Sequence, residues 1–157
     1  MKLVDILQPG AITVDLKSEK KDDILSELVD LLVTAGGIRK TDKSKILDKL
    51  KERESLGSTG IGKGIGIPHA KCQSAKKMSA AIGISRKGLD FRSLDGEPTY
   101  IFFLLIAPGE SPGPHLKCLA KISRLLDDKF IREMLRSARN PQDVFNIVKT
   151  EEQKQAQ

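Results

Sequence analysis

The sequence predicts an α/β fold, in which helices cover a central sheet within a single domain. Segments that alternate like strands are interspersed with amphipathic helical segments along the 157 residues, as is typical of α/β proteins. The most apolar stretch, TYIFFLLI at 99–106, is typical of a central strand buried on both faces. The chain is long enough to bury one hydrophobic core, and it shows no internal repeat.

The N-terminal part predicts a helical turn, a strand and a long helix. The turn covers 3–7 and stops at a Pro-Gly pair, and residues 11–16 alternate as in a strand. Ser18 is a candidate N-cap for the helix that follows. A Gly-Gly pair ends this helix. Its apolar residues form a single stripe at i, i+4, i+7, i+8 and i+11: Ile24, Leu28, Leu31, Leu32 and Ala35.

A second helix is predicted to begin at Thr41 and to carry a functional arginine near its end. Ile46, Leu47 and Leu50 point inward in this helix, and its lysines point outward. Arg53 lies at the C-terminal end, where it can lean over the glycine-rich segment that follows.

The C-terminal half predicts three strands and two helices. The strands cover 65–68, 79–85 and the apolar run at 99–106, which a Pro-Gly pair ends. A loop of Gly, Ser and Pro leads to His115. That residue shares the inward face of a helix with Leu119, Ile122 and Leu126. An Asn140–Pro141 pair is typical of the N-cap and first position of a last helix. The domain is predicted to cover 1–150, followed by a disordered tail at 151–157.

The segment KERESLGSTGIGKGIGIPHAKC at 51–72 is the densest in backbone-permissive residues. Its five glycines allow tight turns and a close backbone approach to a ligand. Pro68 biases Ile67 toward an extended conformation and presents His69 directly afterwards. A histidine that only packs in a core does not need this arrangement.

Three interpretations of this segment compete. GSTGIGK fits the first seven positions of a P-loop, but Gly64 stands where the magnesium-binding Ser or Thr belongs, and a charged helix precedes the motif. A plain glycine-rich loop with a hydrogen-bonded histidine is the second interpretation. In the third, His69 is a nucleophile, and Arg53 and the loop amides bind an anion. No G-x-G-x-x-G dinucleotide motif is present.

The stretch RESLGSTGIGKGIGIPHA resembles the active-site segment of the fructose–mannitol-type enzyme IIA domains of the bacterial phosphoenolpyruvate-dependent phosphotransferase system. The likeness is strongest to the stand-alone, nitrogen-regulatory IIA proteins, and it extends from about Leu3 to about Val148. It implies a mixed sheet of about five strands between helical layers. It also implies that His69 is the phosphorylated residue.

The resemblance implies a mechanism that needs neither a metal nor a nucleotide, because the phosphoryl group arrives already activated. His69 accepts that group from a phosphohistidine of a histidine phosphocarrier protein. The planar fork of Arg53 suits two phosphoryl oxygens, and amides around Ser58 and Thr59 could add donors. The family's second active-site histidine corresponds to His115 in PGPHLKCLAKIS. Capping or packing remains the alternative role for His115.

A zinc module is a rival hypothesis from a different class. Each histidine is followed three residues later by a cysteine, as His69-x-x-Cys72 and His115-x-x-Cys118. Two such pairs could form a tetrahedral site. The glycines and the proline before His69 have no role in such a site, and both cysteines could be small apolar residues instead.

Composition limits the partners and the compartment. The net charge is +6, but the lysines lie beside acids, and one tyrosine and no tryptophan are available for base stacking. We therefore expect a solvated surface, or docking to an acidic protein, and no nucleic acid. The sequence has no apolar run of about 18 residues and no signal-peptide core, so we expect no membrane insertion. With no secretory signal, the two cysteines suggest reduced thiols in the cytoplasm.

We expect a phosphoryl carrier and regulator of the phosphotransferase system. No sugar-binding or membrane segment and no IIB-like cysteine motif is attached to this sequence, and stand-alone IIA proteins of this length are more often regulatory than sugar carriers. Regulatory target proteins or a IIB domain would then be partners. The alternatives are the IIA component of a fructose- or mannitol-type uptake system, and an interaction module that phosphorylation switches.

Overall fold

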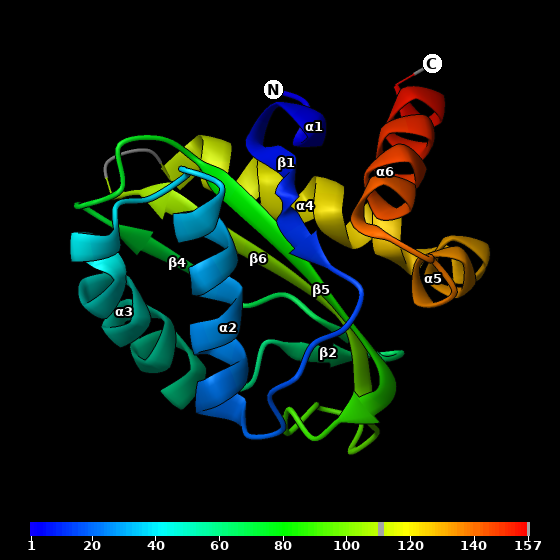
Figure 1. Cartoon of the computed structure of the whole chain (residues 1–157), viewed down its shortest axis with the longest axis horizontal. Coiled ribbons are helices and arrows are strands. Elements are labelled where there is room, and N and C mark those ends of the chain that lie inside the picture. Colours follow the sequence, from blue (N-terminus) through cyan, green and yellow to red (C-terminus); the bar gives the residue numbers. More distant parts are fainter. Residues whose placement is uncertain (110–111, 157) are drawn as a thin grey trace.

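A mixed sheet of six strands forms the centre of the molecule, and helices cover both of its faces (Figure 1). The computed structural model describes residues 1–109 and 112–156. The elements are α1 (Leu3–Ile6), β1 (Leu7–Thr13), α2 (Lys21–Thr34), the 3-10 turn η1 (Lys40–Asp42), α3 (Lys43–Ser55), β2 (Gly60–Gly62), β3 (Ile65–Gly66), β4 (His69–Cys72), β5 (Ser79–Leu89), β6 (Thr99–Pro108), α4 (Pro112–Asp127), α5 (Lys129–Arg136) and α6 (Pro141–Gln155).

The strand order is β1-β5-β6-β3-β2, and β4 also pairs with β6. β5 and β6 are antiparallel, whereas β1 runs parallel to β5. β3 and β4 both run parallel to β6 and follow one another along it, and β2 forms an antiparallel pair with β3. The predicted fold class, an α/β domain with a mixed sheet between helices, is confirmed.

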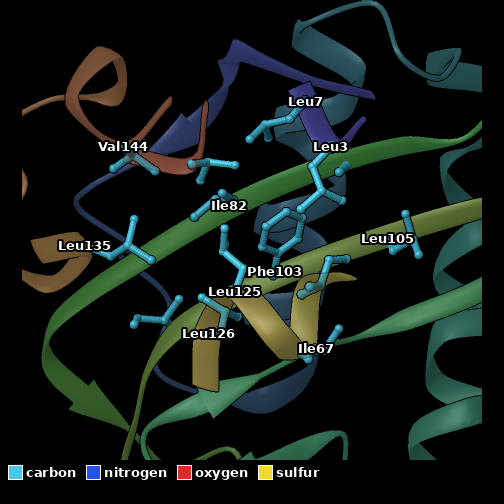
Figure 2. Close-up of a cluster of buried hydrophobic side chains, with 14 of the residues drawn as sticks. Leu3, Leu7, Ile67, Ile82, Phe103, Leu105, Leu125, Leu126, Leu135 and Val144 are labelled. Carbon is cyan, nitrogen blue, oxygen red and sulfur yellow. The ribbon is translucent and has the colours of Figure 1, made fainter. Parts of the chain in front are cut away.

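Alternate residues of β6 enter two different hydrophobic clusters. Ile101, Phe103 and Leu105 pack with residues of α4, α5 and α6, in the cluster that Figure 2 shows. Phe102 and Leu104 pack with residues of α2 and α3 on the other face. Because side chains alternate across a strand, this arrangement confirms that the apolar run is a strand buried on both faces.

Several predicted elements occur where the sequence places them. Ile24, Leu28 and Leu32 are buried along α2, and the other two stripe residues are partly buried. Asn140 caps α6, because its side chain accepts a hydrogen bond from the Asp143 amide over 2.8 Å.

Two N-terminal predictions are wrong. Ser18 does not cap α2, which begins after Lys20. The Ser18 amide instead donates to the Glu27 carboxylate over 2.9 Å. The Pro9–Gly10 pair lies inside β1 and does not stop a segment there. β1 is an edge strand, where proline is tolerated because one side of the strand needs no ladder hydrogen bonds.

The structure also differs from the prediction at the C-terminal end. The short helix α5 was not predicted; Asp128 caps it by accepting from the Phe130 amide over 2.8 Å. Residues 151–155 continue α6 and do not form a disordered tail. The Glu152 carboxylate anchors this turn by accepting from the Leu3 amide over 2.5 Å. Residues 110–111 of the predicted Gly-Ser-Pro loop, and Gln157 of the tail, lie outside the described residues.

Candidate active site

His69 is the first residue of β4, and the sheet determines its position. β4 runs parallel to β6 with His69 opposite Leu105, and the Leu105 amide donates to the Pro68 carbonyl over 3.0 Å. The Pro68 ring restricts the backbone immediately before the histidine. The imidazole is half-buried, so one part of it remains accessible.

The hydrogen bond of the His69 ring determines which nitrogen is free. Nδ1 lies 2.7 Å from the carbonyl oxygen of Ile67. A carbonyl oxygen only accepts, so Nδ1 carries the proton and the lone pair of the neutral ring is on Nε2. Burial lowers the pKa of His69, the bond to Ile67 opposes this, and the charge of Arg53 lowers the pKa further. A neutral ring is the nucleophilic form.

His115 lies in the first turn of α4 and faces His69. The ring centroids are 5.6 Å apart, and the ring planes make an angle of 50°. His115 is only 5% exposed, and its Nδ1 has no hydrogen-bond partner among the described residues. Burial, together with the charges of His69 and Lys71, lowers the pKa of His115 to about 4. An uncharged ring with an unpaired nitrogen therefore lies beside His69.

Arg53 lies in the last turn of α3 and reaches toward the glycine-rich segment. Its Nη1 donates to the Gly57 carbonyl over 2.9 Å. Arg53, His69 and His115 line a single pocket of about 420 Å³. The structure thus brings together the three side chains that the sequence analysis assigned to catalysis.

Glu54, which no sequence motif singled out, holds the start of the glycine-rich segment. Its buried carboxylate accepts from the Thr59 amide over 3.1 Å and from the Thr59 hydroxyl. Lys21 of α2 forms an ion pair with the same carboxylate at 2.8 Å. The helical spacing indicates that Glu54 lies on the buried face of α3. Ile46, Leu50 and Glu54 stand at i, i+4 and i+8, and all three are buried.

The Ser58 hydroxyl and both donors of Thr59 are engaged in hydrogen bonds within the protein. The Ser58 hydroxyl donates to the Phe91 carbonyl and accepts from the Gly60 amide, each over 3.0 Å. Thr59 is only 2% exposed, and both its amide and its hydroxyl bind Glu54. The segment is organised as the β2–β3 hairpin, so these two residues hold that hairpin in place.

The hairpin also contradicts the P-loop interpretation. A P-loop joins a strand to a helix, whereas here α3 precedes the motif and β2 lies within it. Lys63, the residue in the P-loop lysine position, forms an ion pair with Asp127 of α4 at 2.8 Å. That contact ties the hairpin to the α4 end that lies away from His115.

The four residues of the proposed zinc site do not converge. Cys118 packs in the cluster under α4, α5 and α6, whereas Cys72 packs in the cluster under α2 and α3. The two thiols therefore lie on opposite faces of the sheet. Over 1–109 and 112–156, no group of three or more His, Cys, Asp or Glu side chains is placed to bind a metal ion.

Comparison with known proteins identifies the family. The family model described as "Phosphoenolpyruvate-dependent sugar phosphotransferase system, EIIA 2" matches residues 5–151. The chain belongs to this family. Domains of the family are phosphotransfer proteins, which makes the chain a component of phosphoryl transfer. Within the part of the chain that the structure describes, no helix is long and apolar enough to span a bilayer.

Relatives in the family carry both regulatory and sugar-related names. A nitrogen regulatory protein of Bradyrhizobium diazoefficiens is 34% identical over 94% of this chain and 95% of its own length. A fructose-specific EIIABC component of Bacillus subtilis is also 34% identical over 94% of this chain, which spans only 23% of that protein. The crystal structure of the nitrogen regulatory protein IIA-Ntr from Neisseria meningitidis has a TM-score of 0.84 at 30% identity. That match covers 93% of this chain and 98% of the other.

Proposed function

We propose that this IIA domain is a phosphoryl carrier with a regulatory role, and that it accepts the phosphoryl group on Nε2 of His69. The observation that carries the proposal is the hydrogen bond from Nδ1 to the Ile67 carbonyl. That bond leaves the lone pair on Nε2 of a ring in the pocket shared with Arg53 and His115. The donor is a phosphohistidine of a histidine phosphocarrier protein.

The transfer needs no oxidant, metal or nucleotide. The Nε2 lone pair attacks phosphorus, the N–P bond of the donor phosphohistidine breaks, and its electron pair returns to the donor nitrogen. Positive charge then develops on the His69 ring, and the Ile67 carbonyl stabilises that charge by accepting from Nδ1–H. Phosphoryl transfer otherwise depends on in-line positioning and on neutralising the equatorial oxygens.

Arg53 and His115 supply that positioning and neutralisation. The guanidinium of Arg53 can hydrogen-bond two phosphoryl oxygens at once. His115 offers its ring to the phosphoryl group, or steadies the His69 ring. The pocket rim carries Leu56 and Leu116, which are 82% and 64% exposed. Exposed leucines at this position suit a contact with a partner protein during the transfer.

Two roles in the phosphotransferase system remain distinct. The regulatory role is favoured by relatives named nitrogen regulatory protein, which this chain matches over nearly their whole length. The IIA component of a fructose- or mannitol-type uptake system is the second candidate, favoured by the fructose-specific relatives. In the uptake role, a IIB domain would accept the phosphoryl group. In the regulatory role, the expected partners are regulatory target proteins.

The decisive experiment is phosphorylation of the purified chain by phosphoenolpyruvate, the first enzyme of the system and a histidine carrier protein. We expect one acid-labile, base-stable phosphoryl group per chain, and we expect His69→Ala to abolish it while circular dichroism stays unchanged. His115→Ala is the matched control, which should still be phosphorylated, but more slowly. A phosphoryl group that persists in His69→Ala would overturn the assignment.

A further inference from the structure

A second pocket is lined by residues at α1, in the second half of α4 and in α6. Figure 1 shows where these three helices lie. Its volume is about 620 Å³, which is within the range of small-molecule sites. None of the residues of the His69 pocket lines it. The phosphotransfer proposed above therefore leaves this pocket without a role.

Four cationic side chains from three elements converge on this pocket. Lys2 precedes α1, Lys121 and Arg124 lie one helical turn apart on α4, and Lys149 belongs to α6. In the part of the chain that the structure describes, none of the four forms an ion pair. Lys121 donates to the Met1 carbonyl, a contact that leaves its charge uncompensated.

The two carboxylates of the pocket are occupied by backbone amides. Asp5 accepts from the Lys2 amide over 3.1 Å. Glu152 accepts from the Leu3 amide over 2.5 Å and from the Val4 amide over 3.3 Å. These bonds hold α1 against α6. The pocket therefore carries four positive and two negative groups, and the negative groups are not paired with the positive ones.

Apolar side chains form part of the wall between these charges. Leu3 and Leu125 are each 1% exposed and belong to the core cluster, and Val4 is partly buried. Val4 is therefore an apolar side chain of the lining that a ligand can reach. It suits the carbon skeleton of a ligand, whereas a purely inorganic anion would leave it in contact with water.

From this arrangement we propose that the α1–α4–α6 pocket binds a small organic phosphate. The phosphate oxygens contact Arg124, Lys149, Lys121 and Lys2, and the carbon part lies against Val4. Arginine and lysine together provide bidentate and point-charge contacts to phosphate. The site is separate from His69, and its occupancy does not depend on phosphotransfer.

The test uses the full chain with ATP in the presence of EDTA as the probe, followed by calorimetry and by chemical-shift mapping. We expect saturable binding, with shift changes confined to α1, the second half of α4 and α6. Arg124→Ala and Lys149→Ala should each weaken binding by about ten-fold or more, as expected for the loss of one charged hydrogen bond. Inorganic pyrophosphate should bind in the same pocket but more weakly, because it does not reach the apolar wall.

The matched control is Lys154→Ala, which removes the same charge from an exposed position of α6 that does not line the pocket. This control should keep the affinity of the parent chain, and so should His69→Ala, which abolishes phosphotransfer. No shift changes in the pocket at millimolar ATP would overturn the proposal, and so would equal weakening by Lys154→Ala. Pyrophosphate binding as tightly as ATP would overturn the organic part of the assignment.

Discussion

At the residue scale, His69 and His115 differ in how their nitrogens are used. His69 has one nitrogen bound to Ile67 and the other free in the pocket. His115 is more deeply buried, with Nδ1 unpaired among the described residues. An unpaired buried nitrogen costs stability. The unpaired nitrogen of His115 is explained if it gains a hydrogen-bond partner when a phosphoryl group enters the pocket.

The buried His115 ring makes stability depend on pH. Its pKa falls from 6.5 to about 4 on folding, so between these values the unfolded chain binds more protons than the folded chain. Stability is therefore fully present above pH 6.5 and is lost as the pH falls toward 4, by about 3 kcal/mol in total. Denaturant titrations across this range should show the loss, and His115→Gln should reduce it. An equal loss in that variant would show that other groups titrate.

Arg53 is predicted to act through the shape of its guanidinium as well as its charge. In Arg53→Lys the charge remains but the bidentate contact to the phosphoryl group is lost. We expect phosphorylation of His69 to slow by roughly 10- to 1000-fold, or about 1.4 to 4 kcal/mol of transition-state stabilisation. The initial rate should be measured with the donor protein well below saturation. An unchanged rate would reduce Arg53 to a residue that only caps the Gly57 carbonyl.

At the element scale, β6 brings the separate parts of the site together. β3 and β4 follow one another along the same edge of β6, and α4 follows β6 in the chain. His69 and His115 therefore lie near the same end of β6 although 46 positions separate them in the sequence. Glu54 and Lys21 tie α3 and α2 to the start of the hairpin.

The close packing of α2 on β5 requires glycine at position 83. A Cβ atom there would lie 2.7 Å from Cδ1 of Leu16 and 2.9 Å from Cδ2 of Leu28. We expect Gly83→Ala to destabilise the fold by about 1 to 3 kcal/mol, because both leucines are buried and must move. The midpoint of urea unfolding measures this change.

The control for that substitution is Gly10→Ala, also in a strand, where the added Cβ would meet only the Ala35 Cβ at an ordinary 3.7 Å. Its unfolding midpoint should stay close to that of the parent chain. Equal midpoints for the two variants would contradict the packing argument.

At the scale of the whole molecule, the sheet divides the interior into two clusters and places one cysteine in each. We therefore expect no stoichiometric zinc in the purified protein by elemental analysis. Cys72→Ala and Cys118→Ala should leave phosphorylation of His69 intact, because neither thiol lines its pocket. One zinc per chain that is lost in either variant would overturn this prediction and the role of His69 as a free nucleophile.

The sequence predicted the elements whose signal is local. The apolar stripe of α2, the continuous apolar run of β6 and the Asn140–Pro141 pair each depend on spacing within one segment, and the structure has all three. The helix α5 was not predicted, because its eight residues are too few to show a clear helical periodicity. The tail was misjudged because its anchor, Glu152, binds amides of α1 at the other end of the chain.

By itself, the sequence determined the family, because RESLGSTGIGKGIGIPHA is one specific motif that contains Arg53 and His69. It singled out His115 through a separate and shorter likeness in PGPHLKCLAKIS. Only the tertiary structure decided what the neighbouring residues do. Ser58 and Thr59 look like phosphate donors in the motif, but their hydrogen bonds go to Phe91 and Glu54. Those partners belong to other elements, so no spacing along the chain could reveal them. The same holds for the two cysteines, because which face of the sheet a residue joins is set by strand pairing and helix packing.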